Sequence, residues 1–165
     1  MKNLDFNPAK STEDFRKNYK LHDIAEFNGK NLLMQWGFKC SDFGEDNRYR
    51  KVWEKGDDKP DSIISYKNKS ALLDWKGKRG AKWLVNERAI KSYKKWSDEF
   101  GLPIVVASFV INDEQKIIKR NFAILNKHSF QISKSRQWDK NTTIEFQRDI
   151  PEFTKANLIN ILFNE

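Results

Sequence analysis

The chain has 165 residues, of which 38% are hydrophobic and 33% are charged, and it contains six tryptophans. This composition predicts one globular domain over residues 1–165 and excludes a disordered chain. The formal net charge of +8 at pH 7 favours a polyanionic partner, because lysine and arginine bind phosphates partly by releasing counterions.

The sequence also bears on where the protein works. No apolar run approaches the ~18 residues that a membrane-spanning helix needs. Met1–Lys10 lacks the apolar core of a signal peptide, so we expect neither export nor a membrane partner. The single cysteine, Cys40, cannot form an internal disulfide, which fits a reducing cytoplasm.

A first helix is predicted from Ser11 to about Trp36, with a capping hydroxyl and acidic residues at its start. At about 100° per residue, one stripe of this helix combines apolar residues with His22 and Glu26. An unpaired carboxylate on an apolar face is costly. Glu26 is therefore either salt-bridged at the edge of the core or part of a functional site. His22 is interpreted as a packed or capping histidine.

Two strands are predicted next, Phe38–Phe43 and Arg48–Trp53, around a polar turn. The second strand alternates Arg48 and Arg50 with Tyr49, Lys51 and Trp53, which gives cations beside aromatic residues. Such an arrangement can hold a phosphate backbone or stack on an unpaired base. The alternative is the solvated face of a hairpin.

The spacing of Asp61, Asp74 and Lys76 is the one in this sequence that indicates a chemically active site. Asp61 opens a predicted strand, Ser62–Tyr66, and a polar turn leads to a second predicted strand, Ala71–Lys76. Because successive side chains of a strand point to opposite faces, Asp74 and Lys76 share one face. Asp61, at the start of the partner strand, is expected to lie within reach of both.

A short basic turn with Lys78 and Arg79 follows, and a helix is then predicted over Ala81–Phe100. Lys82 and Asn86 fall on the apolar face of this helix, in the turns nearest the acidic residues. They are second-tier candidates for a place in the site. The alternative is that they are the polar ends of a core helix and reach solvent.

The rest of the chain predicts more strands and a final helix. The β-branched run Pro103–Ile111 predicts a central strand buried on both faces, which forms a βαβ unit with the preceding helix and strand. Further strands are predicted over Lys116–Leu125, Ser129–Ser133 and Thr143–Gln147, with a polar loop to about Thr142 before the last one. A helix is predicted from Pro151, and its apolar end needs burial on the domain or on a second subunit.

The residues Pro60-Asp61, a gap of twelve residues and Asp74-Trp75-Lys76 resemble the PD-(D/E)XK nuclease signature. Over roughly Ala25–Ile111, the spacing and the order of elements look most like the archaeal Holliday-junction resolvase branch of that superfamily. The resemblance implies a restriction-endonuclease-like α/β fold, with a central mixed sheet flanked by helices and an α-β-β-β-α-β core. It also implies a homodimer, since resolvases cut two strands symmetrically.

The same resemblance implies a metal-dependent active site. Asp61, Asp74 and the main-chain carbonyl of Trp75 would bind Mg²⁺ or Mn²⁺, and Glu26 would add a ligand or orient water. Lys76 would lie over the attacking water or the scissile phosphate. Glu13 is the alternative acid on the first helix. We expect a basic face for nucleic acid around the carboxylates, formed by Arg48, Arg50, Lys78, Arg79 and Lys82.

The predicted function is a Mg²⁺-dependent endonuclease that hydrolyses phosphodiester bonds of duplex or branched DNA. The alternatives are a sequence-specific, homing or mobile-element endonuclease of the same fold, and a catalytically silent nucleic-acid-binding module. The sequence supports no competing chemistry, because it has no Cys/His cluster for zinc, no Gly-rich phosphate loop and no nucleophile-elbow motif.

Overall fold

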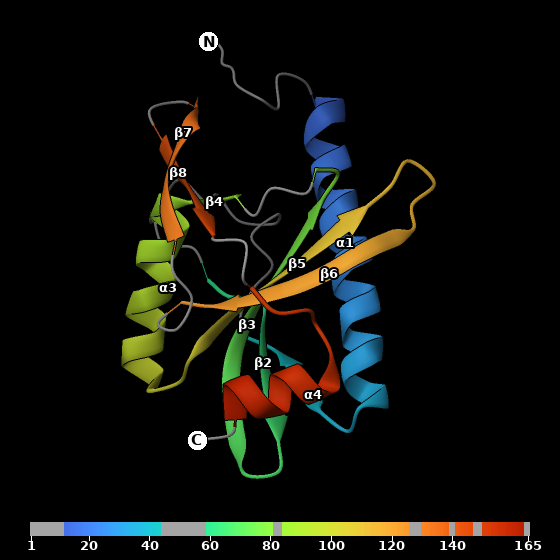
Figure 1. The fold of residues 1–165 in the computed structure, drawn as a ribbon, viewed down its shortest axis with the longest axis vertical. Coiled ribbons are helices and arrows are strands. Elements are labelled where there is room, and N and C mark those ends of the chain that lie inside the picture. Colours follow the sequence, from blue (N-terminus) through green and yellow to red (C-terminus); the bar gives the residue numbers. More distant parts are fainter. Residues whose placement is uncertain are drawn as a thin grey trace.

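The structure is a computed structural model that describes residues 12–43, 59–80, 84–125, 130–138, 141–146 and 150–163. Figure 1 shows how its elements are arranged. In chain order they are α1 (Thr12–Gln35), β1 (Lys39–Asp42), β2 (Ser62–Tyr66), β3 (Lys69–Lys78), β4 (Leu84–Asn86), α3 (Glu87–Phe100), β5 (Ile104–Ile111), β6 (Ile117–Ile124), β7 (Phe130–Trp138), β8 (Asn141–Phe146), α4 (Lys155–Asn157) and the π-helical turn η2 (Leu158–Phe163).

The central sheet has five strands in the order β1-β2-β3-β5-β6. β3 and β5 are parallel, whereas the other neighbouring pairs are antiparallel, so the sheet is mixed. The parallel pair is connected through α3, as expected for a βαβ unit. The predicted α/β class is confirmed, and so is the order of helix, three strands, helix and strand, although β4 is inserted before α3. β4, β8 and β7 form a second, antiparallel sheet.

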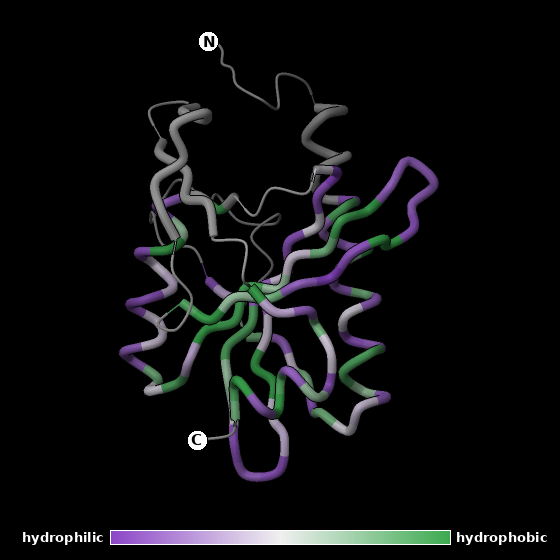
Figure 2. The backbone as a smooth tube through the Cα atoms, viewed as in Figure 1, coloured by the Kyte–Doolittle hydropathy of each residue, from purple (hydrophilic) through white to green (hydrophobic). Residues whose placement is uncertain are grey.

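Helices cover both faces of the central sheet, with α1 and α3 on opposite sides in Figure 1. On one face, Leu73 and Trp75 of β3 pack in a hydrophobic cluster with residues of α1 and η2. On the other face, Leu72 packs with Ile90 and other residues of α3. β5 is buried along its whole length, as its β-branched sequence predicts. The hydrophobic stretches in Figure 2 accordingly gather in the central strands.

Two glycines allow α1 to lie close against β3. A Cβ atom on Gly29 of α1 would overlap the ring of Trp75, which is fully buried. A Cβ atom on Gly77 of β3 would overlap the main-chain oxygen of Leu21 in the helix. Only glycine permits this approach of helix backbone to strand. The contact positions the middle of α1 beside the strand that carries the predicted signature.

The C-terminal segment completes the same core. Phe153 and Leu158 are fully buried and Phe163 is nearly so, all in the cluster between the sheet and α1. The apolar end of the chain is therefore buried on the domain itself. Within the described ranges, no helix is long and apolar enough to cross a bilayer.

Two sequence predictions for the middle of the chain are wrong. The helix expected from Ala81 begins only at Glu87, because Leu84–Asn86 forms β4 and pairs with β8. The polar loop expected before Thr142 is instead largely strand, because β7 continues to Trp138 and pairs with β8. In the first case pairing with a strand distant in sequence outweighs local periodicity, whereas in the second β7 and β8 are consecutive strands of one hairpin. The predicted strand Arg48–Trp53 lies outside the described residues.

The last helix also begins later than predicted. Pro151 and Phe153 run beside β6, where the main-chain nitrogen of Phe122 donates to the oxygen of Pro151 at 3.0 Å. The helix begins after Thr154, whose hydroxyl accepts a hydrogen bond from the main-chain nitrogen of Asn157 at 3.1 Å. The first turn of the predicted helix is therefore absent. Its residues run along β6 instead, and Thr154 caps the helix that follows.

We expect Gly77→Ala and Gly29→Ala to lower the free energy of unfolding by about 1–3 kcal/mol or more, because overpacking forces α1 away from β3. Thermal melts followed by circular dichroism measure the effect. Gly80→Ala is the matched control, since a Cβ atom there meets no heavy atom within 4 Å. Equal melting temperatures for all three variants would contradict the close packing.

Candidate active site

The register of the β2–β3 hairpin brings two aspartates together. Ser62 pairs with Leu73, so Asp61, which immediately precedes β2, comes opposite Asp74. The main-chain nitrogen of Asp61 donates to the oxygen of Leu73 at 3.1 Å. The Asp61 carboxylate reaches over β3, and its Oδ2 accepts a hydrogen bond from the main-chain nitrogen of Trp75 at 3.0 Å. The number of residues between Asp61 and Asp74 is thus set by the length of this hairpin.

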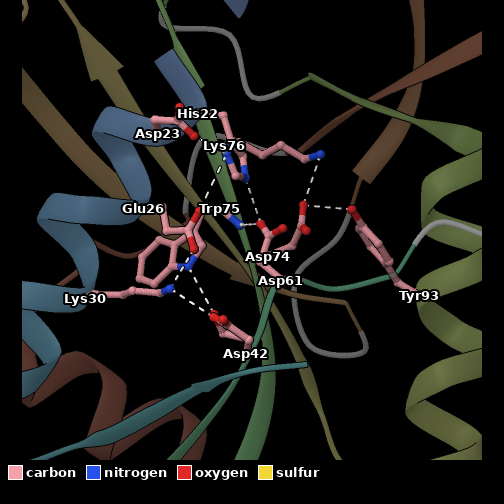
Figure 3. Close-up of polar contacts among 11 residues, drawn as sticks. His22, Asp23, Glu26, Lys30, Asp42, Asp61, Asp74, Trp75, Lys76 and Tyr93 are labelled. Carbon is pink, nitrogen blue, oxygen red and sulfur yellow. Dashed lines mark hydrogen bonds and ion pairs between the residues drawn. The ribbon is translucent and has the colours of Figure 1, made fainter. Parts of the chain in front are cut away.

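Asp74 is buried on the face of β3 that α3 covers, and only 4% of it is exposed. Its Oδ2 accepts two hydrogen bonds, from the Tyr93 hydroxyl at 2.7 Å and from Lys76 Nζ at 3.0 Å. Figure 3 shows both donors at one end of the carboxylate. The predicted placement of Asp74 and Lys76 on one face is confirmed.

Burial raises the pKa of Asp74 to about 6, and the charge of Asp61 adds to this effect. The charge of Lys76 and the hydrogen bonds from Tyr93 and Lys76 act in the opposite direction but do not outweigh it. The protein thus compensates only part of the negative charge of the ionised Asp74. A bound cation would compensate the rest.

α1 brings His22 to the same place. His22 Nε2 lies 3.0 Å from Asp61 Oδ2. Burial acts to lower the pKa of His22, but the hydrogen bond and charge of Asp61, with the charges of Asp74 and Glu26, raise it to about 9. At neutral pH the imidazole is therefore protonated and offsets part of the negative charge of the acids.

Glu26 contacts both the site and a lysine. Its Oε2 lies 2.6 Å from Lys30 Nζ, and Lys30 Nζ also lies 3.1 Å from Asp42 Oδ1 of β1. Its Oε1 lies 3.7 Å from Nδ1 of His22, whose other ring nitrogen contacts Asp61. Glu26 is thus salt-bridged at the edge of the core and also connected through His22 to the aspartates. Both interpretations of this residue therefore stay open.

The donor set fits a hard divalent cation. Asp61 and Asp74 offer carboxylate oxygens from opposite strands, and oxygen is the ligand that Mg²⁺ prefers. On α1, His22, Asp23 and Glu26 have ligand atoms that all lie within 4.8 Å of one another. The buried Nδ1 of His22 has no hydrogen-bond partner. Because the His22 imidazole is protonated at neutral pH, the possible ligands are the carboxylates of Asp61 and Asp74 from the hairpin and those of Asp23 and Glu26 from α1.

Of the five predicted nucleic-acid residues, the structure describes Lys78 and Arg79. Lys78 is half-buried at the end of β3. The guanidinium of Arg79 donates to the main-chain oxygens of Ile111 and Asn112 and thereby attaches the end of β3 to the β5–β6 turn. Arg48, Arg50 and Lys82 lie outside the described residues. Glu13 and Asn86 belong to described elements, but their side chains are not among those described. Asn86 is the last residue of β4, so it does not lie on α3 as predicted.

Two residues of the site were not identified as such from the sequence. His22 lies four residues before Glu26 on the same helical stripe, so the periodicity that selected Glu26 contained a signal for it. Tyr93 belongs to the apolar face of α3 and looks there like any core aromatic residue. Only the packing of α3 on β3 shows that its hydroxyl meets Asp74.

No family model matches the sequence, and no curated protein matches it at a significant level. Among solved structures, this chain is similar to Hjc, a Holliday junction resolvase from the archaeal hyperthermophile Archaeoglobus fulgidus. The two chains are 13% identical with a TM-score of 0.48, over 78% of this chain and 84% of that chain. This similarity does not assign the chain to a family.

We expect Asp74→Asn to be more stable than wild type in EDTA at pH 8, because it removes a buried charge. A folded-state pKa raised from 3.8 to about 6 favours the protonated acid. This contribution to stability is present below a pH of about 4 and is lost as the pH rises through about 6. The melting temperature of the variant relative to wild type should therefore rise between these pH values. Asp98→Asn, at an exposed position, is the control. A pH-independent difference for Asp74→Asn would contradict the raised pKa.

Proposed function

We propose that this protein is a metal-dependent endonuclease that hydrolyses DNA phosphodiester bonds. In this proposal it belongs to the PD-(D/E)XK superfamily, with a layout like that of the resolvase branch. The observation that carries the proposal is the pairing of Asp61 with Asp74, with Lys76 3.0 Å from Asp74 on the same face. A pair of carboxylates beside a lysine is an arrangement that supports metal-assisted hydrolysis of a phosphodiester.

Each residue has a separate task in this reaction. Asp61 and Asp74 would hold Mg²⁺ or Mn²⁺ together with the Trp75 carbonyl, and Glu26 would complete the site from α1. A divalent cation bound there supplies charge to phosphate oxygens and makes a water molecule more acidic. His22 orients Asp61 through its 3.0 Å contact.

Lys76 is the group that meets the substrate. Its side chain is 30% exposed, whereas that of Asp74 is 5% exposed, so the lysine links the buried acid to the surface. Its ammonium group would move from Asp74 to a phosphate oxygen, where positive charge stabilises the charge that develops in the transition state.

A catalytically silent binding module is less consistent with the buried acid. An ionised Asp74 whose pKa is raised by burial reduces stability in the absence of a cation. A binding surface for DNA gains nothing from such a group, since carboxylates repel phosphates. Perturbed acids of this kind gather at catalytic sites. Duplex or branched DNA as the substrate, a homodimer and a cytoplasmic location belong to the proposal as well.

We expect Asp74→Asn and Lys76→Met to lower the cleavage rate by roughly 10²-fold or more while DNA binding is retained, because each removes stabilisation specific to the transition state. Linear duplex, flap, four-way-junction and single-stranded DNA are incubated with Mg²⁺, Mn²⁺ or EDTA, and the products are resolved on gels. Lys67→Met, in the exposed β2–β3 turn, is the matched control for Lys76→Met. Wild-type rates for either active-site variant would overturn the assignment.

Glu26→Gln separates the two interpretations of Glu26. If Glu26 completes the cation site, the variant should lose at least ~10-fold in cleavage rate per folded molecule. Lys30→Met breaks the same ion pair from the other side and should leave that rate near wild type. If Glu26 serves only the ion pair, both variants should lower the melting temperature alike and keep wild-type cleavage. That result would remove Glu26 from the site.

A further inference from the structure

Tyr93 of α3 is 2% exposed, and its hydroxyl reaches the buried carboxylate of Asp74. The hydrogen bond is 2.7 Å long and is directed to Oδ2, the oxygen that also accepts from Lys76 Nζ at 3.0 Å. Lys76 Nζ lies 6.0 Å from the centre of the Tyr93 ring, so the three groups form one compact cluster. Figure 3 shows that Lys76 and Tyr93 come to this oxygen from different elements, β3 and α3.

The two donors make the oxygens of Asp74 unequal. A carboxylate oxygen has about two lone-pair sites, and both sites of Oδ2 are taken by Tyr93 and Lys76. A cation would therefore meet Oδ1 rather than Oδ2. Without the tyrosine hydroxyl, the carboxylate can rotate and present either oxygen.

We propose that Tyr93 is a positioning residue that fixes Asp74 Oδ1 toward the cation and holds it there when Lys76 turns to the substrate. This inference rests on the proposed function. When Lys76 turns from Asp74 to a phosphate oxygen, it leaves a buried acid with one donor fewer. The Tyr93 bond remains, because α3 is anchored by its own hydrophobic cluster and does not follow the lysine.

A core tyrosine whose hydroxyl merely finds the nearest acceptor is the competing explanation. The two explanations differ in what the hydroxyl affects. A core tyrosine influences the melting temperature, whereas a positioning residue influences the affinity for the cation. Partners that orient metal ligands typically change metal affinity or activity by about 10–100-fold when removed.

Tyr93→Phe is the decisive variant, and Tyr66→Phe is its matched control. Tyr66 lies on β2, packs on Phe38 with ring centres 4.9 Å apart, and lies against the opposite hydrophobic cluster. Binding of Mn²⁺ without DNA is measured by electron paramagnetic resonance of the free ion. Cleavage is then measured at saturating Mn²⁺.

We expect Tyr93→Phe to weaken Mn²⁺ binding and to lower kcat, each by roughly 10-fold or more, with KM for DNA within about twofold of wild type. Tyr66→Phe should match wild type in both measurements. Lys76→Met should lose kcat but keep or gain Mn²⁺ affinity, since Tyr93 still orients Asp74 and a positive charge beside the acids is removed. The expected difference in Mn²⁺ affinity between Lys76→Met and Tyr93→Phe does not depend on the stability of any one variant.

The outcomes distinguish this inference from the proposed function. If the wild type cuts DNA and Tyr93→Phe keeps both Mn²⁺ affinity and kcat, the positioning role is wrong and the nuclease assignment stands. If the wild type cuts no DNA but Tyr93→Phe still weakens Mn²⁺ binding, the positioning role stands and the nuclease assignment fails. Loss of Mn²⁺ affinity in Lys76→Met equal to that in Tyr93→Phe would also overturn the inference.

Discussion

The register of the β2–β3 hairpin determines which groups meet at the candidate site. Because Ser62 pairs with Leu73, Asp61 and Asp74 come opposite each other, and a slip of one residue would move a strand's side chains to the other face. Burial holds this register, since every residue of β3 from Ala71 to Trp75 is buried. The packing that forms the core thus also keeps the two acids together.

Two acids brought together in this way need compensating groups, and these come from both sides of the sheet. His22 of α1 contacts Asp61, whereas Tyr93 of α3 and Lys76 of β3 contact Asp74. Each helix is anchored in a separate hydrophobic cluster, so the donors are held independently. The pKa of Asp74 is nevertheless raised to about 6, above all by burial. Buried acids whose pKa is raised in this way are enriched at functional sites.

The approach of α1 to the sheet shows how backbone packing serves this chemistry. Gly29 and Gly77 have no side chain, and a Cβ atom at either position would keep the helix and the strand apart. The helix segment between Leu21 and Gly29 contains His22 and Glu26, so this close helix–strand contact is also where the helix contributes polar groups. A wider helix–sheet separation would leave His22 too far from Asp61 for their 3.0 Å contact.

The sequence by itself determined the parts that depend on local pattern. The alternation of β3 placed Asp74 and Lys76 on one face, the hairpin length brought Asp61 opposite Asp74, and the β-branched run became the buried β5. These features follow from strand periodicity and turn length, which involve residues close in the chain. Tertiary structure alone decided the rest. Leu84–Asn86 became strand because β8 pairs with it, and His22 and Tyr93 became site residues because two helices pack on opposite faces of β3. Contacts between residues far apart in the sequence leave no local pattern, since their geometry exists only after the layers have packed.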